Sequence, residues 1–153
     1  MKALLLIPTL LILSTGASAQ SDLLHAAPHK DMPNTTERWY SAQDIQKGQQ
    51  VFKQNCAACH GDKAQGIVKD WRAELPNGKY PAPPLNGSAH AWHHRLKALD
   101  GTIQRGGIPI GGTMPAFKDK LTRHERLQAI AYFQSFWSDN IYQAWLKRGG
   151  LKP

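Results

Sequence analysis

Three features are scarce in this sequence: cysteine, strand-like alternation and long apolar runs. Only two cysteines occur, Cys56 and Cys59, so a zinc site built from two cysteine pairs is excluded. No segment alternates convincingly between polar and apolar residues, so we expect an all-α fold. After residue 13 no apolar run approaches the roughly 20 residues that span a bilayer, so we expect no stable membrane insertion.

The first residues have the pattern of a secretory leader. Lys2 gives a positive start, residues 3–13 are apolar, and Ala17-Ser18-Ala19 fits a cleavage site. The apolar run is too short for a membrane anchor. We therefore predict that residues 1–19 are a cleaved signal peptide and that the protein is exported, to the periplasm in a bacterium with two membranes.

Acidic residues are outnumbered by basic ones. The chain has 19 Lys and Arg against 11 Asp and Glu, a formal charge of +8 that falls to about +7 when Lys2 leaves with the leader. The basic residues are scattered singly, which argues against nucleic-acid binding. The balance favours acidic protein partners.

The remaining chain divides into three parts. Residues 20–40 lack an apolar period and contain Pro28 and Pro33, so we predict a flexible or loosely docked arm. Residues 41–138 form the main domain, and residues 139–153 form a tail with a short helix. The arm also carries His25, His29 and Met32, a weak alternative site for copper.

Helical spacing predicts the elements of the main domain. A helix begins after Ser41, whose hydroxyl can cap it with Asp44 three residues on, and runs into residues 55–56. A short helix is expected over residues 90–99 and a strong one over 122–137. Residues 62–89 are rich in glycine and proline and predict loop. These helices alone bury too little apolar surface for their length, so something else must fill the centre.

Residues 56–60 read Cys-Ala-Ala-Cys-His, the C-x-x-C-H pattern of c-type haem attachment. Two thiols one helical turn apart can add to two vinyl groups on one porphyrin edge, and His60 can then bind the iron. A thioredoxin-type dithiol belongs after a strand, and here the motif ends a helix. The sequence therefore predicts one covalent haem c.

With this motif the sequence resembles the class I cytochromes c, in particular small bacterial monohaem members. The resemblance covers roughly residues 41–137 and rests on Gly48, Phe52, residues 56–61, Pro83-Pro84-Leu85, residues 112–117 and Ala131-Tyr132-Phe133. It implies helices and long loops around one haem. The amino- and carboxy-terminal helices should cross near Gly48 and Phe52 against Tyr132.

The resemblance also implies a partner for the proximal histidine. It points to the carbonyl of Pro83, with Pro84 as the near alternative, as the acceptor that holds the second ring nitrogen of His60. Trp92 and Tyr80 are candidates to hydrogen-bond the haem propionates, although each could instead simply pack with its polar tip in water. Trp71, Trp137 and Trp145 are interpreted as structural.

Met114 is the predicted sixth ligand of the iron. It lies in a glycine loop and is stiffened by Pro115, so it can carry its thioether to the far face of the haem. The alternatives are His90, His93 and His94, one of which could replace Met114 or join a separate metal site. The role of this histidine cluster stays open.

A haem with both axial positions filled suits electron transfer rather than enzyme catalysis. We therefore expect a monomeric, single-electron carrier between larger acidic redox partners such as an oxidase, reductase or dehydrogenase. One alternative is a haem-bearing subunit stably docked to an oxidase or dehydrogenase. Less favoured alternatives are a bis-histidine haem protein, an enzyme or gas sensor with a labile iron ligand, and a copper-handling module.

Overall fold

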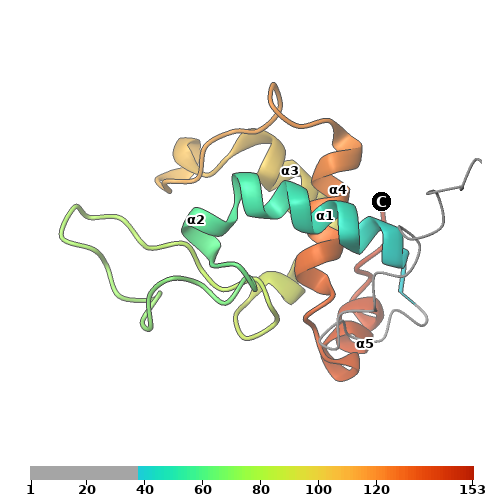
Figure 1. Ribbon diagram of the computed structural model, residues 1–153. Helices are drawn as coiled ribbons and strands as arrows, with labels where there is room; N and C mark the ends of the chain where they lie inside the picture. Colours follow the sequence, from blue (N-terminus) through green and yellow to red (C-terminus); the bar gives the residue numbers. More distant parts are fainter. Residues whose placement is uncertain (1–37) are drawn as a thin grey trace, which may run out of the picture. The chain divides into compact units, whose positions relative to one another are not determined.

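The computed structural model describes residues 38–153, and the predicted leader and most of the predicted arm lie outside this range. The described residues contain helices and turns and no strand (Figure 1). No helix in this part is long and apolar enough to cross a membrane. The elements are α1 (Ala42–Asn55), α2 (Ala57–His60), η2 (Ala91–His93), α3 (Leu96–Arg105), η3 (Ile108–Ile110), α4 (Arg123–Gln134) and α5 (Asp139–Lys147).

Helix α1 begins where the sequence predicts. The hydroxyl of Ser41 accepts a hydrogen bond from the backbone N–H of Asp44, whose carboxylate accepts one from the Ser41 backbone N–H at 3.0 Å. This reciprocal cap satisfies amide groups that the first turn leaves unpaired. Ile45, Gly48 and Phe52 then form the buried face. The cap and the apolar spacing together fix both the start of α1 and the side that faces the core.

Helices α1 and α4 cross closely, as the resemblance implies (Figure 1). A side-chain carbon added at Gly48 would collide with the backbone carbonyl of Gln128, so only glycine permits this approach. One helical turn later the rings of Phe52 and Tyr132 lie 5.2 Å apart. The predicted crossing is confirmed.

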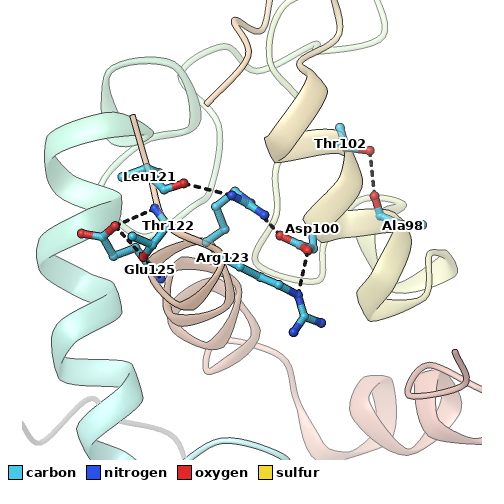
Figure 2. Close-up of polar contacts among 8 residues, drawn as sticks. Ala98, Asp100, Thr102, Leu121, Thr122, Arg123 and Glu125 are labelled. Carbon is cyan, nitrogen blue, oxygen red and sulfur yellow. Dashed lines mark hydrogen bonds and ion pairs between the residues drawn. The ribbon is translucent and has the colours of Figure 1, made fainter. Parts of the chain in front are cut away.

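A buried ion pair joins α3 to α4 (Figure 2). Arg126 Nε lies 2.7 Å from Asp100 Oδ1, and Arg126 also donates to the carbonyl of Leu121 at 2.9 Å. The Asp100 and Arg126 side chains are 12% and 6% exposed, whereas Arg123, 3.5 Å from the other Asp100 oxygen, is 75% exposed. Because both partners are paired and hydrogen-bonded, the bridge fixes α3 against α4.

The helix expected over residues 90–99 is wrong in its bounds. Residues 91–93 make a single 3-10 turn, His94 and Arg95 are extended, and α3 runs from Leu96 to Arg105. The break coincides with contacts to the end of the chain. Trp145 Nε1 donates to the His94 carbonyl at 2.8 Å, and the Leu96 N–H donates to the Gly150 carbonyl at 2.8 Å. These long-range bonds replace the helical ones, which local spacing could not reveal.

Helix α5 packs into the core together with the residues that precede α1. It is the short helix expected in the tail, and its Tyr142 and Trp145 are buried. Residues 38–40, the end of the predicted arm, are docked rather than loose. The Trp39 N–H donates to the Tyr142 hydroxyl at 2.9 Å, and Arg38 pairs with Asp139 at 2.7 Å.

Candidate haem site

A large apolar cavity lies among the loops and helices. Its volume is about 780 Å³, within the range of about 300–1,000 Å³ that small-molecule and cofactor sites occupy. Phe52, Leu99, Ile103 and Phe133 contribute to its apolar lining. The predicted site residues that line it are Cys56, Cys59, His60, Tyr80, Pro83, His90, His94 and Met114. A group bound in this cavity would fill the centre that the helices alone leave empty.

The two cysteines reach the cavity from the end of α1 and from α2. They form no disulfide, Cys56 is half-buried and Cys59 is exposed. Burial raises the pKa of the Cys56 thiol to about 11, with the neighbouring Cys59 adding to the shift. Both sulfurs are thus available for covalent attachment at one edge of the cavity, although in different surroundings.

His60 is buried and held by one hydrogen bond. Its Nδ1 lies 2.9 Å from the carbonyl oxygen of Pro83, which requires the proton to be on Nδ1 and leaves Nε2 unprotonated. Burial lowers the pKa of His60, and the hydrogen bond to Pro83 partly opposes the shift. A neutral imidazole with a free Nε2 is the form that binds a metal.

The Pro83 segment is fixed by the turn that follows the cysteine motif. The backbone N–H groups of Leu85 and Asn86 donate to the carbonyl of Ala64 at 2.7 and 3.1 Å. Ala64 is fully buried and has a left-handed backbone, with φ of 56°. An alanine in this conformation is strained, so the surrounding contacts must hold it there. His60 and its acceptor are therefore positioned by one locally bonded unit.

Met114 lines the cavity from an irregular segment after α3. The Gly107 N–H donates to the Met114 carbonyl at 2.9 Å, and the Phe117 N–H donates to the Ile103 carbonyl at 3.0 Å. Lys79, from the long loop before Pro83, reaches across to the Gly111 carbonyl with its ammonium at 3.1 Å. Backbone bonds to the end of α3 thus hold the segment that carries the thioether.

Tyr80 and Trp92, the two residues predicted to contact the haem propionates, differ in their relation to the cavity. Tyr80 lines the cavity and is 59% exposed. Trp92 is not among the described residues that line the cavity. Its ring lies 4.1 Å from the His93 ring and 5.2 Å from the Arg148 guanidinium, because the 3-10 turn directs buried Ala91 rather than Trp92 to the cavity. The propionate role of Trp92 stays a prediction, and no cavity contact of the described residues supports it.

Trp71, interpreted as structural from the sequence, lines the cavity instead. Its ring lies 5.3 Å from that of His90, and the Arg72 guanidinium stacks over it at 4.2 Å. The His90 and His94 rings are 5.6 Å apart. Burial and the nearby His94, His93 and Arg72 lower the pKa of His90. A tryptophan in a glycine- and proline-rich loop gave no periodic signal that could have placed it here.

The histidine cluster does not form a recognisable metal centre of its own. In the described part of the chain no three His, Cys, Asp or Glu side chains converge as ion ligands. His90 and His94 nevertheless share the cavity with Met114, whereas His93 does not line it. The bis-histidine alternative from the sequence thus keeps two of its three candidates.

The residues present fit a haem attached at the cysteine motif. One apolar cavity of suitable volume is lined by two unbridged thiols, by the imidazole that Pro83 holds, and by a thioether. The family model described as cytochrome c oxidase, cbb3-type, subunit III matches residues 43–133, more than half of the chain. The chain belongs to the class I cytochrome c family. Membership implies a covalently bound haem c and electron transfer.

The similar proteins are larger. A thiosulfate dehydrogenase of Stutzerimonas stutzeri (strain A1501) is 32% identical over 103 residues, which are 65% of this chain and 29% of that protein. The cbb3-type cytochrome c oxidase subunit CcoP of Rhodobacter capsulatus is 36% identical over 70 residues, 46% of this chain and 19% of the subunit. This cytochrome thus spans less than a third of the length of these two curated relatives.

A solved structure supports the fold. Cytochrome CL from Methylophaga aminisulfidivorans superposes with a TM-score of 0.50 at 22% identity, covering 74% of this chain and 69% of that one. At this identity the likeness concerns the fold alone. It agrees with the all-α cytochrome c fold that the sequence predicts.

Proposed function

We propose that this chain is an exported monohaem cytochrome c that carries single electrons between larger redox proteins. The observation that carries the proposal is the one cavity that joins two thiols, a buried imidazole held by Pro83, and Met114. The leader-like residues 1–19, removed on export to the periplasm, fit a site of haem attachment outside the cytoplasm.

Each site residue has a defined task in this proposal. Cys56 and Cys59 would hold the porphyrin through their sulfurs, and His60 would offer Nε2 to the iron. Pro83 accepts the Nδ1 proton of His60, which fixes the tautomer and the ring orientation. Met114 supplies its thioether from the opposite loop. Haem, when bound, supplies a reversible one-electron iron couple.

The protein's remaining task is to keep the site dry and both axial positions filled. Apolar side chains from α1, α3 and α4 exclude water from the cavity, and Tyr80 at its edge can donate to a haem carboxylate. With His60 and Met114 both bound, the iron would have no open position for a substrate, so we expect electron transfer rather than catalysis from this chain. The expectation applies to this domain alone and not to an assembly that contains it.

The electrostatics favour acidic redox proteins as partners of a monomeric carrier. Five exposed basic residues lie on the segments that surround the cavity, namely Lys53, Lys63, Arg105, Lys118 and Lys120. Opposite charge on a partner would speed encounter most at low salt. The reaction rate with a candidate acceptor should fall as ionic strength rises; a flat or rising curve would remove steering from the proposal.

Stable docking is a second candidate function. Two relatives of this chain, CcoP of Rhodobacter capsulatus and FixPc of Rhizobium leguminosarum bv. viciae, are cbb3-type cytochrome c oxidase subunits. In that case the domain would pass electrons within an assembly rather than diffuse between partners. Purification of the exported protein from its source at high salt distinguishes the two: a free carrier elutes alone, and a subunit elutes with its oxidase or dehydrogenase.

Optical spectra of the purified ferric and ferrous protein test the haem and its ligands. The ferric protein should show the far-red band of an iron–thioether bond, and Met114→Ala should abolish it. His90→Ala and His94→Ala are matched controls because both side chains line the same cavity, and both should leave the band intact. A wild-type spectrum with no such band would replace Met114 with the histidine alternative, and a colourless folded product would end the haem proposal.

A further inference from the structure

Gly106 touches the backbone that carries Met114. It is the residue that ends α3, and its φ of +73° lies in the left-handed region. A side-chain carbon added there would lie 2.6 Å from the Pro115 carbonyl carbon and 2.7 Å from both the Ala116 nitrogen and the Met114 oxygen. Each is shorter than any distance that real side-chain carbons keep, and each neighbour is backbone. The end of α3 and the Met114 segment are therefore in direct main-chain contact.

Backbone hydrogen bonds on either side of Gly106 also join the end of α3 to the Met114 segment. The Gly107 N–H donates to the Met114 carbonyl at 2.9 Å, and further along the chain the Phe117 and Lys118 N–H groups donate to the Ile103 and Gln104 carbonyls at 3.0 and 3.2 Å. Inserting one methyl group at residue 106 would have to push the two backbones apart and stretch these bonds.

We propose that Gly106 is a positioning residue that holds the Met114 segment against the end of α3 and so determines how firmly the thioether faces the cavity. The inference rests on the proposed axial role of Met114. Gly106 touches no cofactor; it acts through the backbone at Met114 and Pro115. Any side chain at residue 106 loosens the thioether while leaving His60 and its bond to Pro83 unchanged.

Gly111 provides a matched control in the same loop. Its φ of +84° and ψ of 1° place it in the left-handed helical region, and nothing lies within 4 Å of the added carbon. Gly111→Ala thus controls for the loss of glycine and the gain of a methyl group in this loop. Gly106→Ala adds the collision with the Met114 segment and the larger backbone penalty of its ψ of 179°. The difference between the two variants measures what the conformation and the contact of Gly106 contribute together.

The experiment measures the affinity of free imidazole for the ferric holoprotein, because imidazole competes with the thioether for the iron. We expect Gly106→Ala to bind imidazole about ten-fold or more tightly than the wild type, and Gly111→Ala to stay within about three-fold. Equal affinities in the two variants would overturn the proposal. The wild-type far-red band is recorded first, so that its absence assigns the failure to Met114 ligation itself rather than to Gly106.

Hydrogen exchange in the wild type gives a second measurement that needs no variant to fold. Cyanide, which also displaces the thioether, should speed exchange of the Gly107 amide, because that amide bonds to the Met114 carbonyl. Amides in α1 should not change. Unaltered exchange at Gly107 in the cyanide complex would overturn the proposal even if Gly106→Ala does not accumulate.

Discussion

The two walls of the cavity are built in different ways. The wall that carries His60 follows a capped helix, and the histidine is only 8% exposed and bonded to Pro83 within a locally bonded unit. The wall that carries Met114 is irregular chain held by main-chain bonds to the end of α3, and its methionine is half-buried. Because local opening starts where few apolar contacts hold the chain, the Met114 wall should open before the His60 wall.

The largest loss of stability should come from removing the ion pair that joins α3, which leads into the Met114 wall, to α4. Asp100→Ala leaves the buried Arg126 guanidinium without its carboxylate, so we expect a loss of about 3–5 kcal/mol in the free energy of unfolding. Since α3 carries the chain toward Met114, imidazole should also bind the variant more tightly. Denaturant unfolding of the holoprotein measures the first effect and optical titration the second.

Arg123→Ala is the control for that prediction. Arg123 also reaches Asp100, but it is 75% exposed and 3.5 Å away, so its removal should cost less than about 1 kcal/mol. Comparable losses for Asp100→Ala and Arg123→Ala would show that the buried pair does not hold α3 to α4.

The His60 wall should respond next, at the crossing of α1 and α4. The methyl group of Gly48→Ala collides with the Gln128 backbone, so the helices must separate at a cost of about 1–3 kcal/mol. Thermal or denaturant unfolding measures the loss. For each kcal/mol of unfolding free energy lost, Gly48→Ala should change the imidazole affinity less than Asp100→Ala does. A larger change in Gly48→Ala would mean that the His60 wall, and not the Met114 wall, opens first.

Because the backbone of Ala64 is strained, removing its methyl group should change the free energy of unfolding very little. Ala64→Gly relieves about 1–2 kcal/mol of left-handed strain, and it loses about 0.8 kcal/mol of methyl burial and about 0.4–1 kcal/mol through the freer unfolded chain. The net change should lie within about 1 kcal/mol of zero. Ala131→Gly, at an equally buried helical position without that strain, should cost about 2 kcal/mol in the same unfolding assay.

The smallest effect concerns acid and the α1 cap. Hydrogen bonds from the backbone N–H and hydroxyl of Ser41 lower the pKa of Asp44, so its contribution is present above the ordinary carboxyl pKa and is lost as pH falls through the lowered one. Asp44→Asn should therefore be destabilised at pH 7, by less than about 1 kcal/mol, and match the wild type in strong acid. A difference that persists unchanged in strong acid would mean that the carboxylate charge is not its source.

The sequence predicted most of the His60 wall because its determinants are local. Ser41 and Asp44 mark the start of α1, Gly48 marks the crossing, and residues 56–60 spell out the attachment motif within one helical turn. The Pro83 acceptor came from family resemblance, and the structure places its carbonyl 2.9 Å from His60 Nδ1. The axial and covalent roles of these residues stay predictions until spectra are recorded.

The Met114 wall was predictable only in part. Met114 stood out because it follows a glycine pair and precedes Pro115, but nothing local revealed that Gly106 packs against it across the loop. The break within the helix expected over residues 90–99 coincides with bonds to Trp145 and Gly150, more than fifty residues away. Periodicity reports one face of one helix, so contacts of this range escape it.

The pairing of Arg38 with Asp139 also ties the first described residues to α5 rather than to the cavity. The chain enters the described fold beside the start of α5, and no residue of α5 lines the cavity. A pull transmitted through the chain at Arg38 is therefore resisted by Asp139 and the Trp137 carbonyl, and neither residue lines the cavity. Strain applied at this point thus reaches the start of α5 before it reaches His60 or Met114.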